Sequence, residues 1–319
     1  MYKNNLKNIP VRIKSRLRKL ICTPSSKPLR IAIELTNRCN LNCPFCLVGM
    51  DKERDSVAHD DMIRPFGTME MTLVDKILKD AKGFGISEVM LTFQGEPLLH
   101  KHFVDVIRNA KRYGLKTHVF TNGLLLNPDI SRLIVREGLD SMRFSVDGIS
   151  EETYQLNRVG GRFEKVYQNM VEMVRIAREE KSKIELMWQF IALSNNEHEI
   201  EDARKMAKQI GIPIYIKTFA ESIPGLSPKN PEYRRGLQDK PCTDIYRAVY
   251  VYWNGDVVPC CYDVDGKEIM GNIAENTLEA IWNSEKYISF RKQVDEAVSH
   301  PEKESYLCWN CQRWTLPKK

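Results

Sequence analysis

Three closely spaced cysteines are the feature that most constrains this chain. Cys39, Cys43 and Cys46 form the pattern C-x3-C-x2-C directly after an apolar, strand-like segment at residues 31–36. A 4Fe-4S cluster that only transfers electrons is usually held by four cysteines. Three thiolates leave one iron without a protein ligand, so the pattern indicates a cluster that binds a small molecule. The alternatives are buried cysteines or a zinc knuckle, although zinc takes four ligands and no second C-x-x-C lies nearby.

The spacing, with the aromatic Phe45 just before the last cysteine, resembles the signature of the radical S-adenosylmethionine (SAM) superfamily. The resemblance implies that the open iron chelates the amino and carboxylate groups of SAM and that Phe45 lies beside SAM. It also implies that one electron from the cluster cleaves SAM to methionine and a 5′-deoxyadenosyl radical. An electron donor such as flavodoxin or ferredoxin is then an expected partner.

The chain from residue 29 to about residue 217 alternates short β-branched runs with amphipathic helical stretches. This alternation predicts βα units and a parallel sheet or barrel. Six units predict an α/β fold built as a partial (β/α)6 TIM-like barrel, in which functional residues gather where strands end. The expected strands are 29–36, 87–93, 116–121, 141–146, 184–191 and 212–217, and the expected helices are 73–82, 101–113, 129–137, 163–180 and 197–210.

Two expected strand ends carry further motifs. Gly95, Glu96 and Pro97 follow the second strand, and Asn122 follows the third. Gly95, Glu96 and Pro97 resemble the glycine-glutamate-proline motif of radical SAM enzymes, which implies that they contact the amino group of SAM. The resemblance also implies that Asn122 lies in the SAM site. The alternative is that these residues form only a turn.

The fourth expected strand places Arg143, Ser145 and Asp147 on one face, because side chains alternate along a strand. The resemblance implies that Ser145 and, downstream, Arg158 hold the carboxylate and ribose of SAM, with Asp147 in the same site. A guanidinium suits a carboxylate because it makes charge-assisted hydrogen bonds. Arg158 as an ordinary surface residue is the alternative.

From these patterns we expect four parts in the chain. Residues 1–28 form a basic segment, 29–220 the radical SAM core, 221–240 a linker rich in Pro and Gly, and 241–319 a small α+β domain. In this last part Asn254-Gly255 separates two apolar runs, 250–253 and 256–258, which predicts a β-hairpin. One or two short helices are expected within residues 276–290.

Five more cysteines lie in the C-terminal part, and four of them are candidate ligands of one site: Cys242, Cys260, Cys308 and Cys311. Four thiolates suit either structural zinc or a fully ligated cluster. Their spacing resembles the SPASM or shorter twitch modules of radical SAM enzymes, without the later cysteines of the full SPASM pattern. The resemblance implies a single auxiliary 4Fe-4S cluster here, and two clusters in all.

The cysteine next to this set, Cys261, is a candidate hydrogen-atom donor. It adjoins Cys260, and neighbours on a strand point to opposite faces. If its thiol reaches the substrate, the weak S–H bond can return a hydrogen atom to a carbon radical. The alternative is a small buried apolar residue.

The net charge of +6 belongs to the N-terminal segment. Residues 1–30 hold nine Lys and Arg and no acid, and residues 6–21 read as a basic amphipathic helix. We expect it to pack on the main domain, with docking on an anionic membrane as the alternative. Nucleic-acid binding is not expected. Because no signal peptide or apolar run of 18 residues is present, and nine cysteines suit a reducing compartment, we expect a cytoplasmic protein.

The combined pattern predicts an oxidoreductase or epimerase that acts on a small, carbohydrate-like substrate. Twitch-type relatives and the short segment before the first strand favour this over a SPASM-type peptide or protein maturase, and a non-catalytic metal-binding or sensor protein is the alternative from another class. Four residues on expected strands are candidates for the substrate site, with the register of their strands left open: His118, Gln189, Tyr215 and Lys217.

Overall fold

The computed structural model describes residues 27–46, 64–218, 225–234 and 244–299. The expected N-terminal helix and half of the expected linker lie outside these ranges. So do Cys22, Cys242, Cys308 and Cys311.

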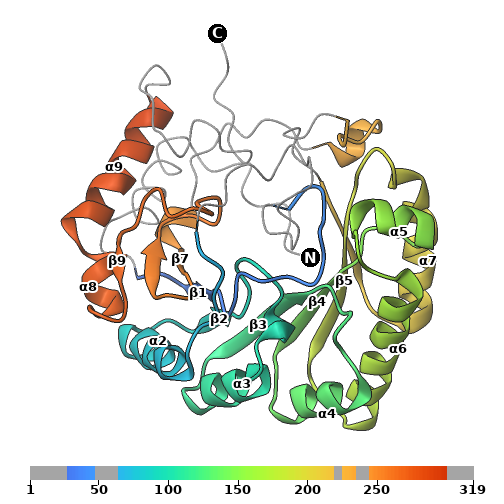
Figure 1. The fold of residues 1–319 in the computed structure, drawn as a ribbon, viewed down its shortest axis with the longest axis horizontal. Helices are drawn as coiled ribbons and strands as arrows, with labels where there is room; N and C mark the ends of the chain where they lie inside the picture. Colours follow the sequence, from blue (N-terminus) through green and yellow to red (C-terminus); the bar gives the residue numbers. More distant parts are fainter. Residues whose placement is uncertain (1–26, 47–63, 219–224, 235–243, 300–319) are drawn as a thin grey trace, which may run out of the picture.

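Six parallel strands form the first part of one curved sheet, and helices cover its outer side (Figure 1). Neighbouring strands pair in sequence order, so each βα unit follows the last around the arc. The sheet does not close on itself, because its order runs from β6 at one edge to β9 at the other. This confirms the predicted partial barrel. The strands are β1 (Arg30–Ile33), β2 (Glu88–Met90), β3 (Lys116–Thr121), β4 (Ser141–Ser145), β5 (Glu185–Ile191) and β6 (Ile214–Lys217), and the covering helices are α2 (Met71–Phe84), α3 (Phe103–Arg112), α4 (Pro128–Arg136), α6 (Phe163–Glu179) and α7 (Ile200–Ile210).

The core lies between the strands and these helices. Outward-facing strand residues such as Ile31, Val119 and Phe144 are fully buried against apolar helix residues such as Val74 and Met170. Each such burial contributes about 1.5–3 kcal/mol of hydrophobic stabilisation. The alternate residues of β3 and β4 keep some solvent exposure. At β3 and β4 the two faces of the sheet are therefore unequal, and the face toward the helices is the more deeply buried one.

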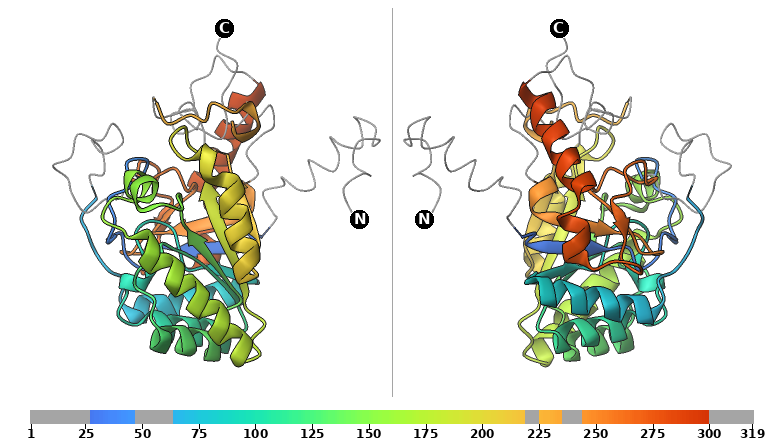
Figure 2. Two further views of the ribbon diagram at one scale, coloured as in Figure 1. Left: turned by 90° about the vertical axis from the view of Figure 1, so that its right-hand side faces the viewer. Right: turned by 90° about the vertical axis from the view of Figure 1, so that its left-hand side faces the viewer.

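The expected hairpin extends the same sheet. β7 (Ala248–Val251) pairs in parallel with β1, and β8 (Asp256–Val258) and β9 (Gly271–Asn272) add to it in antiparallel order. Gly255 adopts φ 91° in the β7–β8 turn, a conformation that favours glycine. The helices α8 (Leu278–Trp282) and α9 (Glu285–Ser299) follow. Figure 2 shows the two edges of the molecule in turn, with α6 and α7 on one and α9 on the other.

One helix was not expected from the sequence. The seven-residue α5 (Glu151–Asn157) lies between β4 and α6, and the Ser150 hydroxyl caps it by accepting a hydrogen bond from the Thr153 N–H. Such a short helix gives no readable periodicity, so its N-cap serine was the only signal. Among the described residues, no helix is both long and apolar enough to span a membrane.

Candidate functional site

The three-cysteine loop leaves the carboxyl end of β1. Cys43 is buried, and Cys39 and Cys46 are half-buried. The loop turns tightly, because the Cys46 N–H donates to the Cys43 carbonyl over 3.0 Å. The Asn42 N–H donates to the Val159 carbonyl over 2.9 Å. This bond fixes the loop against the segment that follows α5.

The environment of the thiols fits a group that carries positive charge. Burial raises the pKa of Cys39 to about 12 and that of Cys43 to about 11. The charge of Cys46 adds to the rise in pKa at both Cys39 and Cys43, so the three sulfurs lie within electrostatic reach of one another. Buried, crowded thiols ionise only beside a cation, and the irons of a cluster supply that charge. The donor set therefore fits an iron–sulfur cluster.

No three His, Cys, Asp or Glu side chains within the described ranges converge on the position of a single metal ion. A 4Fe-4S cluster makes a different demand, because each thiolate binds its own iron.

The glycine-glutamate-proline turn packs directly on the segment that leads to Cys39. Gly95 adopts φ 71°, and a Cβ there would come within 2.3 Å of the Thr36 carbonyl oxygen and 2.6 Å of that of Arg38. The Glu96 N–H donates to the Arg38 carbonyl over 2.8 Å. Only glycine permits this approach, which places the turn against the cysteine loop.

The side chain of Glu96 ties the ends of β2 and β3 together. It is buried and accepts hydrogen bonds from the Thr121 hydroxyl (2.7 Å) and the Asn122 N–H (2.8 Å). Burial raises the pKa of Glu96, and these donors oppose the rise. The Asn122 side chain in turn donates to the Asn40 side-chain oxygen over 2.8 Å, and Pro97 begins a short 3₁₀ turn. The motifs after the first three strands thus form one connected unit.

Arg158 lies in the interior of the site and is only 9% exposed, so its interpretation as a surface residue is wrong. Its Nε donates to Asp147 Oδ2 over 2.8 Å, and its Nη1 lies 3.7 Å from Cys43 Sγ. Its guanidinium lies 5.3 Å from the centre of the Phe45 ring. Burial alone would lower the pKa of Arg158, but the charges of Asp147 and Cys43 raise it, so the guanidinium stays charged.

The register of the strands places the four open candidates on one face. Gln189 pairs with both Ser145 and Tyr215, and His118 pairs with Ser141, two residues before Arg143. Directly paired residues share a face, as do residues two apart on a strand. We call this side of the sheet, opposite the helices, the inner face. It carries Ala32, Met90, His118, Phe120, Arg143, Ser145, Gln189, Tyr215, Lys217 and Tyr250.

Cys261 also belongs to the inner face. It packs against a small cluster that includes Ala32, Met90, Phe93 and Tyr250, in which the rings of Phe93 and Tyr250 lie 5.1 Å apart. The neighbouring Cys260 is half-buried, and its sulfur accepts a hydrogen bond from the Tyr262 N–H over 3.4 Å. Of the four C-terminal cysteines, only Cys260 lies among the described residues.

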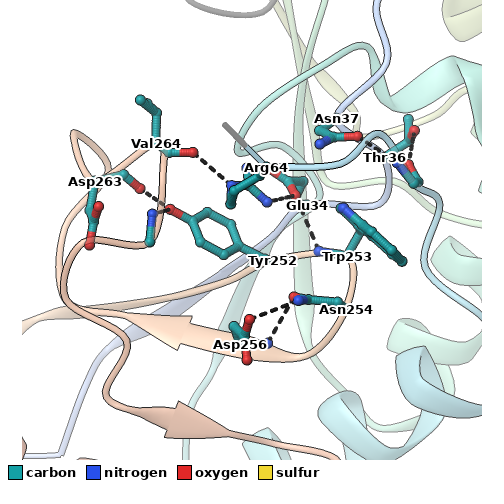
Figure 3. A network of polar contacts seen from close by, with 12 residues as sticks. Glu34, Thr36, Asn37, Arg64, Tyr252, Trp253, Asn254, Asp256, Asp263 and Val264 are labelled. Carbon is teal, nitrogen blue, oxygen red and sulfur yellow. Dashed lines mark hydrogen bonds and ion pairs between the residues drawn. The ribbon is translucent and has the colours of Figure 1, made fainter. Parts of the chain in front are cut away.

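A buried ion pair that the sequence analysis missed links the cysteine loop to the hairpin (Figure 3). Both guanidinium nitrogens of Arg64 donate to the two carboxylate oxygens of Glu34, over 3.0 and 2.9 Å. Arg64 Nε also donates to the Val264 carbonyl over 2.7 Å, and its guanidinium lies 3.4 Å from the centre of the Tyr252 ring. The Trp253 N–H donates to Glu34 over 3.2 Å. Glu34 directly follows β1, so this pair fixes the Cys260–Val264 loop relative to Cys39.

Hydrogen bonds between neighbouring side chains and the backbone add to this link. The Thr36 hydroxyl donates to the Gly67 carbonyl over 2.6 Å, and Asn37 exchanges hydrogen bonds with Gly67 and Pro65 (Figure 3). The one sequence signal was Glu34 itself, because an acid in an apolar strand needs a buried partner. Its partner lies 30 residues further on, and no pattern marks it.

Comparison with known proteins gives two family matches. The model described as the radical SAM superfamily matches residues 33–208, and the one described as an iron–sulfur cluster-binding domain, SPASM, matches residues 242–312. A cofactor-modifying protein for tungsten-containing aldehyde ferredoxin oxidoreductase from Pyrococcus furiosus is 23% identical over 303 residues, which cover 81% of this chain and 82% of that protein. Other curated relatives are matched over 38% to 58% of their own length.

Two solved structures share the fold. BtrN in complex with AdoMet and 2-DOIA is 20% identical with a TM-score of 0.57, and the match covers 89% of this chain and 92% of that chain. SuiB from Streptococcus suis, bound to SAM, is 14% identical with a TM-score of 0.67, over 95% of this chain and 79% of that chain. SuiB has also been solved with its precursor peptide SuiA.

Proposed function

The chain belongs to the radical SAM superfamily, and from that premise we propose that it removes a hydrogen atom from a small, carbohydrate-like molecule in a dehydrogenation or an epimerisation. The observation that carries the proposal is the polar inner face beside the cysteine loop, where His118 and Gln189 offer hydrogen-bonding groups for hydroxyls. The structure of BtrN with the small molecule 2-DOIA supports it.

Each group of cysteines then has a role. Cys39, Cys43 and Cys46 would hold the SAM-binding 4Fe-4S cluster, and Cys260 with Cys242, Cys308 and Cys311 the auxiliary one. When bound, the first cluster would supply the electron that cleaves SAM to methionine and a 5′-deoxyadenosyl radical, and the auxiliary cluster would accept an electron from the substrate radical.

The protein's part is to bind and orient SAM. Gly95 and Glu96 would present the turn after β2 to the amino group of SAM, while Ser145 and Arg158 would bind its carboxylate and ribose. Asp147 holds the Arg158 side chain in one orientation over 2.8 Å. Arg158 also keeps a donor 3.7 Å from Cys43, so it can neutralise negative charge at the sulfur.

Anaerobic reconstitution with iron and sulfide tests this function. We expect about eight irons per chain, because two 4Fe-4S clusters are proposed. On reduction with SAM, a sugar or cyclitol should stimulate formation of 5′-deoxyadenosine, and peptides should not. Stimulation by peptides alone would favour a maturase, the use that the SuiB complex with SuiA supports. Zinc without iron, or iron without SAM cleavage, would contradict an enzymatic role and favour a metal-binding or sensor protein.

Cys261 distinguishes the two reactions. In an epimerisation its S–H bond breaks, a C–H bond forms on the substrate radical, and the sulfur regains an electron and a proton from the reductant and solvent. In deuterium oxide the product of the wild-type enzyme should then contain one deuterium at the reacting carbon, and Cys261→Ala should lose it while still forming 5′-deoxyadenosine. Mass spectrometry of the product measures this, with Cys22→Ala as the control. If the products of the wild-type enzyme and of Cys261→Ala contain equal amounts of deuterium, Cys261 serves only in packing.

A further inference from the structure

We propose that the inner face binds an oxyanion of the substrate, a carboxylate or a phosphate group, through Arg143 with His118 beside it. The proposal rests on the proposed function in one respect, the use of the inner face for substrate. It adds the charge of that substrate, which no motif in the sequence indicates.

The position of Arg143 follows from the strand register. Arg143 pairs with Phe120 on β3 and with Met187 on β5, so it lies on the inner face of a central strand. Its guanidinium lies 5.1 Å from the centre of the Phe120 ring, which supports it from one side. Ser145, at the end of the same strand, lies one step closer to the cysteine loop.

No carboxylate within the described ranges forms an ion pair with Arg143. Within the described part of the chain, Arg64 and Arg158 each form an ion pair with a fully buried carboxylate, and Arg143 forms an ion pair with none. A half-buried cation loses part of its hydration, which is unfavourable unless an anion compensates. A guanidinium matches the planar geometry of carboxylates and phosphates, so the missing anion is best supplied by a ligand.

His118 offers a second donor next to Arg143. Its Nδ1 lies 2.7 Å from the Ser141 hydroxyl, while its Nε2 is buried and has no hydrogen-bond partner among the described residues. Burial lowers the pKa of His118, so the ring is neutral at pH 7. If the Ser141 hydroxyl donates to Nδ1, Nε2 carries the proton and can donate to an anion. A buried polar nitrogen without a partner is uncommon unless a ligand completes it.

The inner face is open enough for a ligand to reach the half-buried Arg143 side chain. The outward residues Val119, Met142 and Phe144 are fully buried, whereas His118, Phe120, Arg143 and Ser145 are only half-buried. In a closed eight-stranded barrel, packed side chains fill the interior, whereas the sheet of this chain does not close. The acids of the inner face, Glu88 and Glu185, begin β2 and β5; their charges raise the pKa of His118 against the effect of burial, and neither forms an ion pair with Arg143.

Direct binding to the reconstituted, SAM-loaded protein tests the proposal without turnover. Isothermal titration with D-glucuronate, D-glucose 6-phosphate and D-glucose compares a carboxylate, a phosphate and a neutral sugar. At least one charged sugar should bind about 10- to 100-fold more tightly than glucose, since a charged hydrogen bond is the main difference. The better of the two identifies the oxyanion. Arg143→Gln should remove this preference, Arg143→Lys should keep part of it, and Arg112→Gln, an exposed arginine on α3, should keep all of it.

Three results would overturn the proposal: equal binding of glucose and both charged sugars, no binding of either charged sugar, or a preference that survives in Arg143→Gln. Circular dichroism of each variant shows that it is folded. The formation of 5′-deoxyadenosine is measured separately, so failure of the proposed reaction leaves the binding result interpretable, and a lost charge preference leaves the reaction standing.

Discussion

Replacing Cys43 by Ala is expected to reduce SAM cleavage to background and the iron content from about eight to about four per chain, since one of two clusters is lost. Cys43 is the most buried of the three cysteines and receives the contact from Arg158. Alanine leaves a second iron without a protein ligand, so the cluster should not assemble. Iron analysis and chromatography of 5′-deoxyadenosine after reduction measure both effects.

Two controls make this result specific. Cys22→Ala should keep its iron and its SAM cleavage, because Cys22 is not a proposed ligand of either cluster. The remaining iron in Cys43→Ala should show the electron paramagnetic resonance signal of one cluster that does not respond to SAM. A variant that still binds about eight irons and cleaves SAM would show that Cys43 is not a ligand.

The second large effect is expected on stability. Replacing Arg158 by Met should lower the free energy of unfolding by about 3–5 kcal/mol, because it leaves the Asp147 carboxylate buried without a counter-charge. Urea denaturation of the iron-free protein under reducing conditions measures this loss. Trp188 is a suitable fluorescent reporter, because its indole N–H donates to the Val146 carbonyl next to Asp147.

A double variant separates the charge from the packing. In Arg158→Met with Asp147→Asn no unpaired charge remains, so part of the lost stability should return. Arg136→Met is the matched control, since Arg136 pairs with Glu180 over 2.9 Å but is 61% exposed. Its loss should stay below about 1 kcal/mol. If Arg158→Met costs no more than Arg136→Met, the buried pair does not stabilise the fold.

The sequence predicted the barrel well because its signals are local. Alternating β-branched and amphipathic segments gave six strands and five helices that the structure contains. The expected first strand, 29–36, was too long, because β1 ends at Ile33 and Thr36 instead forms a bridge with Thr68. The register was not predictable, since a shift of one residue moves every side chain to the other face. The inner-face position of His118 and Gln189 therefore came from the strand pairs.

Contacts between residues far apart in the chain could not be predicted from the sequence. The sequence placed Arg158 in the SAM site by resemblance, and the structure adds that its guanidinium binds Asp147 and lies beside Cys43, 115 residues away. The sequence analysis did not single out Glu34, and nothing in the sequence pairs it with Arg64. Such pairs depend on how loops meet after folding, and loop paths follow no periodic pattern.

The sequence by itself predicted the radical SAM superfamily, because three cysteines at fixed short spacing can be read without knowing the fold. It also determined the parallel strands, because hydrophobic periodicity is a property of neighbouring residues. Only the tertiary structure decided which side chains share the inner face, that the hairpin joins β1, and that Arg143 lies there without a carboxylate partner among the described residues. Those facts depend on contacts between distant segments, and a linear pattern does not encode which distant residues meet.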